Sequence, residues 1–350
     1  MHEIKIGGRS IGENFPPFVI AELSGNHSQQ LSLAMDMVEA AAKAGAHAIK
    51  LQTFTADSMT LDVQSEHFVI QEKDSLWQGQ SLFALYQKAA TPYEWHQPLF
   101  DKATSLGMLA FSSPFDEHAV DFLDDLKVPC FKIASFELTD LPLIRKAASK
   151  KKPLIMSTGM ASLSEIEQAV SVARLAGCND IILLKCTSTY PAHPTQSNIA
   201  TIPHLREAFG CQVGLSDHTA GVGVSVAAVA LGATVIEKHF VLDRQAGGVD
   251  AAFSLEPDEL ASLVLETQRA HQALGQVKYG GTQAEEKSKQ YRRSIYVSEN
   301  VQQGQVLNAQ NLRIVRPAFG LAPKNWDKIL GKVAKHALVK GTPLDWSMFE

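Results

Sequence analysis

The sequence predicts an α/β fold, a (β/α)8 TIM barrel followed by a small C-terminal domain. Short runs rich in β-branched residues alternate regularly with amphipathic helical stretches, which is typical of βα units around a parallel sheet. Eight such runs fall within about 250 residues, the usual length of one (β/α)8 barrel. Several helical stretches end in glycine directly before the next strand, as at Gly45, Gly107 and Gly232, where a left-handed residue commonly ends a helix.

The elements follow one another in a regular order. The expected strands are residues 18–24, 48–54, 108–113, 130–135, 153–157, 180–186, 212–216 and 234–239. The expected helices are residues 31–44, 91–106, 116–126, 141–149, 164–176, 202–209, 223–231 and 257–274. The connection 56–90 shows no clear helix, and a loop of this length in a compact domain usually serves as a lid or a binding loop.

The character of the sequence changes after residue 274. We expect the barrel domain to span residues 1–279, a polar linker to span 280–291 and a second domain to span 292–350. The second domain shows short alternating segments at 294–297, 312–316 and 335–339. With about 60 residues it can bury little core of its own, so we expect it to pack on the barrel or on a second chain.

The composition excludes several classes of protein. With 32 Lys and Arg against 37 Asp and Glu, the formal charge is −5, whereas a nucleic-acid-binding protein shows a basic face. The longest uncharged apolar stretch, residues 220–236, contains Gly and Ser and is shorter than the roughly 20 residues that span a bilayer. The four cysteines form no Cys-x-x-Cys pair and the N-terminus has no apolar signal core, so we expect a cytoplasmic protein that binds neither nucleic acid nor membrane.

Polar residues stand at the end of every predicted strand, where a barrel of this type forms its active site. In strand order they are Glu22, Asn26 and His27; Lys50 and Gln52; Ser112 and Ser113; Lys132, Ser135 and Glu137; Ser157 and Thr158; Thr187, Ser188 and Tyr190; Ser216, Asp217 and His218; and Glu237, Lys238 and His239. Packing alone does not explain eight polar strand ends at one rim, so we expect the functional site there.

His218 and His239 end neighbouring strands, so their imidazoles can converge above the barrel. Two imidazoles supply half of the ligands of a divalent transition metal, and water or substrate oxygens complete the set. Neutral imidazoles favour Mn, Co, Fe or Zn over Mg, although the ions available in the cell can override this preference. The alternative is that each residue is only a hydrogen-bonded histidine at the rim.

Lys50 and Lys132 lie within strands and point their ammonium groups into a half-buried rim, where an unpaired cation is costly. We therefore expect an anion between them. Nearby hydroxyl groups complete a cradle for the phosphate and carboxylate of a small ligand; they belong to Ser113, Ser135, Ser157, Ser188 and Ser216. Two alternatives are an internal salt bridge from one lysine to Glu22 or Glu137, and a Schiff-base lysine.

Three carboxylates, those of Glu22, Glu137 and Asp250, can bind sugar hydroxyl groups or transfer protons. Each can equally be a structural partner of a lysine. Gly247 and Gly248 precede Asp250 and indicate either a flexible rim loop or a plain turn. Because Gly-x-Gly-x-x-Gly and Walker patterns are absent, the sequence gives no support for dinucleotide or ATP binding.

In these motifs the chain resembles the nonulosonic acid synthases of the sialic acid synthase type over nearly its full length. The matching segments are AELSGNH (21–27), KLQT (50–53), SSPF (112–115), KIASFE (132–137), STGM (157–160), CTSTYP (186–191), GLSDHT (214–219) and IEKHF (236–240). The segments LYQKAATPYEWH (85–96) and DAAFSLEP (250–257) are similar to the branch that makes pseudaminic acid. The tail from residue 292 resembles the SAF domain, the fold of type III antifreeze proteins.

The resemblance implies a metal-dependent condensation of phosphoenolpyruvate with open-chain 2,4-diacetamido-2,4,6-trideoxy-altrose, giving pseudaminic acid and phosphate by C–O cleavage. Mn2+ is the expected ion, with Mg2+ or Co2+ as alternatives. The family's phosphoenolpyruvate ligands correspond to Lys50, Ser113, Lys132, Ser135, Ser157, Ser188 and Ser216, its metal ligands to His218 and His239, and its sugar ligands to Gln52, Glu137, Tyr190, Asp250 and Arg316.

The family also implies a domain-exchanged homodimer, in which Arg316 reaches the site of the other subunit. Ala318 and Phe319 follow the Arg-Pro pair where the family often has Gly and Asn or Asp, so the chain departs from the family pattern next to Arg316. On the first strand, Glu22 is placed to orient or deprotonate the attacking water.

Three other functions remain alternatives. The chain can be a synthase of the same family that makes N-acetylneuraminic or legionaminic acid. It can also be an aldolase that forms a Schiff base at Lys132, which borohydride trapping with pyruvate reveals. A sugar-binding protein without catalysis is the third alternative, and the intact set of Lys, Ser and His residues argues against it.

Overall fold

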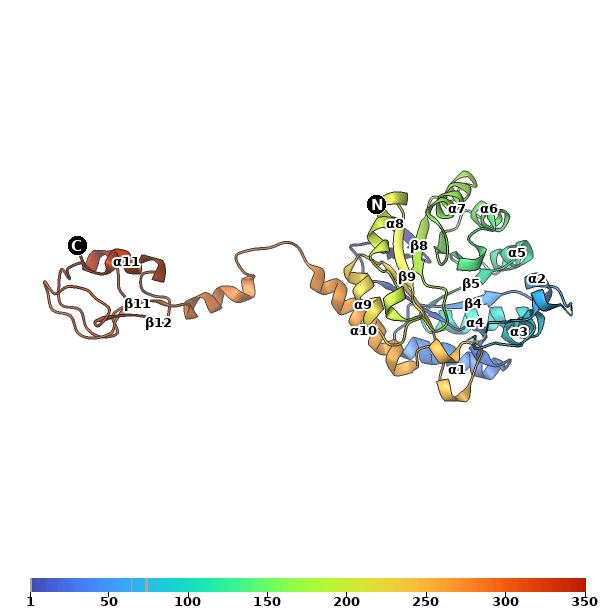
Figure 1. Ribbon diagram of the computed structural model, residues 1–350, viewed down its shortest axis with the longest axis horizontal. Helices are drawn as coiled ribbons and strands as arrows, with labels where there is room; N and C mark the ends of the chain where they lie inside the picture. The colour runs from blue at the N-terminus through green and yellow to red at the C-terminus, as the bar shows by residue number, and fades with distance from the viewer. Residues whose placement is uncertain (1, 64, 73–74) are drawn as a thin grey trace. The chain divides into compact units, whose positions relative to one another are not determined.

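Eight parallel strands close into a barrel, as the alternation of strands and helices predicts (Figure 1). The computed structural model describes residues 2–63, 65–72 and 75–350. In their hydrogen-bonded order the strands are β10 (Val235–His239), β3 (Phe18–Glu22), β4 (Ala48–Thr53), β5 (Leu109–Pro114), β6 (Phe131–Ile133), β7 (Leu154–Ser157), β8 (Ile181–Cys186) and β9 (Gln212–Ser216). All eight predicted strands are confirmed.

Helices connect the strands and cover the outside of the barrel (Figure 1). They are α1 (Leu31–Lys43), α4 (Tyr93–Ser105), α5 (Glu117–Asp125), α6 (Leu141–Ser149), α7 (Leu163–Leu175), α8 (Thr201–Phe209), α9 (Gly223–Ala230) and α10 (Pro257–Leu274). The predicted glycine stops are confirmed, since Gly45, Gly107 and Gly232 have φ of +85°, +82° and +95°. Among the described helices, none has both the length and the hydropathy needed to cross a bilayer.

Two parts of the first 90 residues differ from the prediction. An unpredicted hairpin, β1 (Ile4–Ile6) and β2 (Arg9–Ile11), turns at Gly7 and Gly8 and packs on the barrel, since its three isoleucines are buried in the barrel's apolar cluster. The expectation of a connection without a helix at 56–90 is wrong. That segment contains α2 (Ala56–Met59), the 3-10 turn η2 (Glu66–Phe68) and α3 (Leu82–Ala89).

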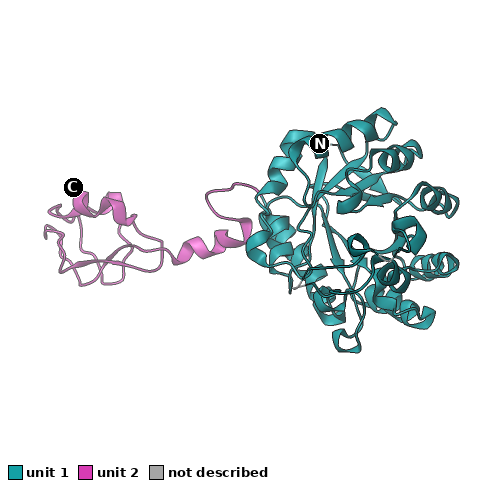
Figure 2. Cartoon of the chain, turned by 45° about the vertical axis from the view of Figure 1, so that its right-hand side comes forward, with its two compact units in different colours: residues 1–275 teal, residues 276–350 magenta. Residues whose placement is uncertain are grey.

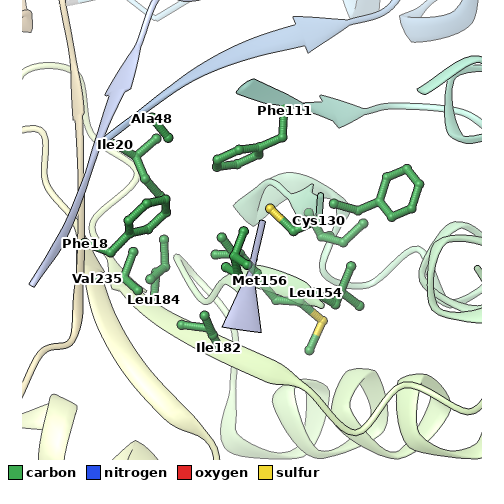
Figure 3. Packing of buried hydrophobic residues seen from close by; sticks show 14 of the residues in the cluster. Phe18, Ile20, Ala48, Phe111, Cys130, Leu154, Met156, Ile182, Leu184 and Val235 are labelled. Atoms are coloured by element: carbon green, nitrogen blue, oxygen red, sulfur yellow. The ribbon is translucent and has the colours of Figure 1, made fainter. Parts of the chain in front are cut away.

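Inside the barrel, the side chains near the beginnings of the strands are apolar, and those near the ends of the strands are polar. Along β3, Phe18 and Ile20 precede Glu22 on the same face, because side chains alternate along a strand. Figure 3 shows Phe18 and Ile20 among apolar side chains from several strands, all of which are buried. Polar groups therefore start where the strands end.

The chain divides into two compact units, Met1–Gly275 and Gln276–Glu350 (Figure 2). The predicted linker carries a 3-10 helix, η7 (Gln283–Tyr291). The second unit pairs β11 (Ser294–Val297) with β12 (Leu312–Val315) and contains η8 (Pro323–Asn325), α11 (Trp326–Ile329) and η9 (Trp346–Met348). The third expected segment, 335–339, forms a single bridge from Leu338 to Val301 instead of a strand. The unit has its own apolar cluster, which includes Ile295 and Ile329.

Candidate active site

The strand register directs the predicted site residues into the barrel. Paired residues of parallel strands point to the same face, and Glu22 pairs with both Lys50 and His239. In the same way Gln52 pairs with Ser113, and Cys186 with Ser216. Because Ile20 and Glu22 face inward together, these polar groups share the upper end of the barrel. The register thus brings the strand ends of the predicted site to one place.

Buried ion pairs link the two lysines to two glutamates. Lys50 forms an ion pair with Glu22, and its Nζ lies 3.9 Å from Glu237 Oε2. Lys132 Nζ lies 3.5 Å from Glu237 Oε1. All four side chains are at least 95% buried. The Glu237 carboxylate therefore lies close to both lysines, and the salt-bridge alternative is correct for Glu22 but not for Glu137. The small anionic ligand expected between the lysines stays a prediction.

Burial and pairing set the charges of this cluster. Burial raises the pKa of Glu22, and the neighbouring Lys50 only partly opposes this effect. Burial would likewise raise the pKa of Glu237, but Lys132 and Lys50 together lower it below its ordinary value. Burial lowers the pKa of Lys132. Each charged side chain in the cluster is stabilised by its oppositely charged neighbours, so the loss of any one of them destabilises the rest.

Hydroxyl groups extend the polar cluster of the lysines and glutamates. Lys50 Nζ donates to Ser113 Oγ at 3.4 Å, and Ser216 Oγ donates to Glu237 Oε1 at 2.9 Å. The Ser157 hydroxyl is buried and has no hydrogen-bond partner within the described ranges. An unsatisfied buried hydroxyl at the end of a barrel strand fits a ligand that is bound from outside.

A glycine lets two further serines approach each other. The Gly159 N–H donates to Ser135 Oγ at 3.1 Å. A Cβ atom on Gly159 would overlap the hydroxyl groups of both Ser135 and Ser188. Only glycine leaves room at this point, so the STGM segment supplies backbone as well as side chains to the cradle.

The two predicted metal ligands lie side by side. The ring centroids of His218 and His239 are 5.2 Å apart, with a 56° angle between the rings. His218 Nδ1 lies 3.0 Å from the Thr187 carbonyl oxygen, and the ring also has the Cys186 thiol as a hydrogen-bonding neighbour. His239 Nδ1 is buried without a hydrogen-bond partner among the described atoms, and Asp250 Oδ2 lies 3.5 Å away. Burial holds the pKa of His239 well below its ordinary value, so this imidazole is a neutral donor.

This donor set fits a divalent metal only in part. The described residues contain no cluster of three or more His, Cys, Asp or Glu side chains able to hold a metal. Two imidazoles are therefore the protein's contribution, and water or substrate oxygens would complete the coordination. Burial opposes the charged form of His218, but the Cys186 sulfur and the Thr187 carbonyl raise its pKa above the ordinary value.

Aromatic rings and a hydrogen-bonded loop form the wall beside the histidines. The Tyr190 ring lies 4.6 Å from the His218 ring, and the Phe253 ring lies 4.9 Å from the His239 ring. Asp250 accepts a hydrogen bond from Ser24 Oγ. The backbone N–H of Asp250 donates to Asn26 Oδ1 at 3.0 Å. Asn26 thus fixes the loop that carries Asp250 next to His239.

The remaining predicted sugar ligands are placed less completely. Gln52 faces the barrel interior on β4, and Glu137 ends the 3-10 turn η3 (Ser135–Glu137). Burial raises the pKa of Glu137 to about 7, and its Oε2 has no hydrogen-bond partner in the described part of the chain. Arg316 lies exposed in the second unit, so its contact with a sugar stays a prediction.

Glu237 is the main residue that we did not include among the expected ligands. It stands at a polar strand end two residues before His239, so strand alternation places both on the inner face. That alternation was the available signal. It could not reveal that one carboxylate would contact both lysines, because this depends on the barrel's closure.

Comparisons with known proteins agree with this arrangement. The model of the NeuB family matches residues 37–279, and that of the SAF domain matches residues 292–350. The chain is 43% identical to pseudaminic acid synthase from Campylobacter jejuni over 95% of this chain and 96% of that one. It is 42% identical to pseudaminic acid synthase from Helicobacter pylori over 94% and 96% of the two chains.

More distant relatives have related names. The chain is 37% identical to N,N'-diacetyllegionaminic acid synthase from Campylobacter jejuni over 90% of this chain and 95% of that one. Among solved structures, the N-acetylneuraminic acid synthetase from Leptospira borgpetersenii superposes with a TM-score of 0.73 at 34% identity, covering 82% of this chain and 95% of that one.

Proposed function

The chain belongs to the NeuB family, and from this premise we propose that it is a pseudaminic acid synthase. The reaction joins phosphoenolpyruvate, open-chain 2,4-diacetamido-2,4,6-trideoxy-altrose and water to give pseudaminic acid and phosphate. The similarity to two pseudaminic acid synthases over nearly the whole chain carries the assignment of this branch. The geometry adds a buried pair of lysines next to a pair of open imidazoles.

Lys50 and Lys132 supply the positive charge for phosphoenolpyruvate. Glu237 lies between their ammonium groups and fixes them before the ligand arrives. The hydroxyl groups of Ser113, Ser135, Ser157, Ser188 and Ser216 then bind the carboxylate and phosphate oxygens. Charge-assisted hydrogen bonds of this kind are short and strong, and they orient the enol carbon toward the histidines.

His218 and His239 would hold the metal, with Mn2+ as the expected ion and Mg2+ or Co2+ as alternatives. When bound, such an ion supplies Lewis-acid polarisation of the sugar aldehyde. Because the protein contributes only two imidazoles, that oxygen and water would complete the coordination. Asp250 lies beside His239 Nδ1 and, with Gln52, Glu137 and Tyr190, faces the sugar.

Glu22 acts as the general base for the adding water. A bond forms between the methylene carbon of phosphoenolpyruvate and the aldehyde carbon, water adds to the enol carbon, and the C–O bond to phosphate breaks. Glu22 Oε1 accepts the backbone N–H of Ser24 at 3.1 Å, while Oε2 pairs with Lys50. A carboxylate held at both oxygens is oriented for general-base action on the adding water.

The homodimer is part of the same proposal. Arg316 of one subunit reaches the acetamido group of a sugar in the other subunit, because the second unit is small and is joined to the barrel by a polar segment. A cytoplasmic location agrees with four buried cysteines that form no disulfide. Mixing an inactive Glu22→Gln enzyme with an inactive Arg316→Ala enzyme tests the exchange. A domain-exchanged heterodimer regains one complete site and up to about a quarter of the activity, whereas sites built within one chain regain none.

Phosphate release from phosphoenolpyruvate in the presence of Mn2+ tests the function. The sugars to compare are 2,4-diacetamido-2,4,6-trideoxy-altrose, the corresponding precursor of legionaminic acid, and N-acetylmannosamine, each with and without EDTA. Release with the altrose sugar alone, abolished by EDTA, is the expected result. Phosphate release only with another sugar would overturn the assignment to the pseudaminic acid synthases but would leave the fold and the site as described.

A further inference from the structure

A buried ion pair lies directly behind the two histidines. Lys238 and Asp217 are 0% and 3% exposed, and Lys238 Nζ lies 3.2 Å from Asp217 Oδ2. Lys238 also donates to the Thr219 carbonyl oxygen. Asp217 Oδ1 accepts the backbone N–H of Thr219 at 2.9 Å and its hydroxyl at 2.8 Å, and Asp217 Oδ2 accepts Ser225 Oγ at 2.7 Å. Both oxygens of the Asp217 carboxylate are thus bound by groups of the protein itself.

Strand alternation puts this pair on the opposite face from the chemistry. Glu237 and His239 face the barrel interior, so Lys238 between them faces outward. Asp217 likewise follows Ser216 and precedes His218, and its partner Ser225 belongs to α9. The pair therefore fills the layer between the barrel and the helices and cannot contact a ligand in the barrel.

The pair also begins where the backbone pairing of the two strands ends. The register between β9 and β10 runs from Gly214 with Val235 to Ser216 with Glu237. Within the described chain, the last backbone hydrogen bond between these strand ends is the one that the Asp217 N–H donates to the Glu237 carbonyl oxygen, at 3.0 Å. Both histidines lie beyond it. The side chain of Lys238 is the next connection between the two strand ends.

We propose that Lys238 and Asp217 are positioning residues that set the separation and direction of the His218 and His239 imidazoles for metal binding. Each member of the pair is the direct chain neighbour of one histidine, so a rotation of either strand end would turn an imidazole away from its partner. This inference rests on the metal site of the proposed function. Although the pair lies on the outer face of the strands, it affects metal affinity through the backbone that joins it to the two histidines.

The test compares Mn2+ binding by the full-length variants, measured from the electron paramagnetic resonance signal of free Mn2+. The variant D217N/K238M removes both charges together and keeps the side-chain sizes, since removing only one member leaves a buried charge unpaired and destabilises the fold. We expect it to fold and to bind Mn2+ about tenfold more weakly, at the lower end of the effect of residues that orient metal ligands. Lys238→Arg retains the cation, and we expect it to bind Mn2+ within about threefold of the original chain.

A matched control lies on another part of the same layer. Thr53 is fully buried on the outer face of β4, and its hydroxyl lies 2.7 Å from His96 Nε2 and 2.6 Å from Ser112 Oγ. Thr53→Val removes this network without touching a strand that carries a metal ligand. We expect a less stable protein with unchanged Mn2+ affinity.

The outcomes are distinct. Unchanged Mn2+ affinity in folded D217N/K238M, or an equal loss of affinity in Thr53→Val, would overturn the inference. Failure of the original chain to bind Mn2+ would overturn the metal site of the proposed function itself, and the inference with it. If D217N/K238M does not fold, the double variant D217N/K238Q, which also removes both charges and keeps a polar group at each position, is judged by the same comparison.

Discussion

The lysine side and the histidine side of the barrel rim satisfy their polar groups in different ways. Lys50 and Lys132 form ion pairs with Glu22 and Glu237 within the chain. On the other side, His239 Nδ1 is buried without a hydrogen-bond partner in the described chain. A buried charge without a partner is far more costly than a neutral nitrogen without one. The lysine side is therefore organised before any ligand binds, whereas the histidine side is completed by what binds to it.

The largest expected effect comes from the open side. We expect His239→Ala to lower kcat/KM about a thousandfold, because a Lewis acid contributes several kcal/mol to a transition state that develops negative charge. Steady-state phosphate release with saturating Mn2+ measures the change. His96→Gln is the matched control, since His96 is a fully buried histidine that bonds to Thr53 outside the site. Comparable losses in both variants would show a general effect of removing a buried imidazole.

A substitution of Glu22, on the lysine side, distinguishes an effect on the chemical step from an effect on phosphoenolpyruvate binding. We expect Glu22→Gln to lower kcat about a hundredfold, because the amide cannot accept the proton of the adding water. Phosphoenolpyruvate affinity, measured by titration calorimetry, should change only a few-fold, since Lys50 keeps Glu237 nearby. An unchanged kcat would remove Glu22 from the mechanism.

The unfolding stability of variants tests the charge network of the lysine side. Lys132→Met leaves the Glu237 carboxylate without its nearer partner, and we expect it to destabilise the first unit by about 3 kcal/mol. Adding Glu237→Gln to Lys132→Met should restore most of that stability but none of the activity. Scanning calorimetry, which can resolve the two units as separate transitions, makes the comparison. Equal stability of the single and double variants would mean that the two residues do not act as a pair.

The smallest expected effect concerns Glu137. Burial raises its pKa to about 7 in the folded chain, above the ordinary value of 4.5, so the folded state binds this proton more tightly than the unfolded state. The resulting stabilisation is complete below about pH 4.5 and is lost as the pH rises through about 7. We expect Glu137→Gln to remove a pH dependence on the order of 2 kcal/mol. Thermal unfolding between pH 5 and 8 tests this, and parallel curves for both proteins would contradict it.

The sequence predicted the barrel well because its signals are local. Strand composition, the 3.6-residue period and glycine stops such as Gly45 and Gly232 are each contained in a few neighbouring residues. The segment 82–89 was missed because its polar neighbours obscured a helix of only eight residues, which begins at the Ser81 cap. The hairpin at 4–11 was missed because three-residue strands carry too little alternation to be recognised.

The candidate site was predictable in its position but not in its pairing. His218 and His239 were expected to meet because neighbouring strands end together, and their rings do lie side by side. The contact of Glu237 with both Lys50 and Lys132 joins strands that are not neighbours in the barrel. Such contacts depend on the diameter and tilt of the closed barrel, which no short segment of sequence specifies.

The most direct test of this account is a crystal structure of the full chain with Mn2+ and phosphoenolpyruvate, with Mn2+ located by its anomalous scattering. We expect one anomalous peak within bonding distance of nitrogen atoms of both His218 and His239, and the phosphate and carboxylate of phosphoenolpyruvate on Lys50 and Lys132. Mn2+ bound elsewhere, or phosphoenolpyruvate bound away from the lysines, would contradict the division of the rim into an organised side and an open side.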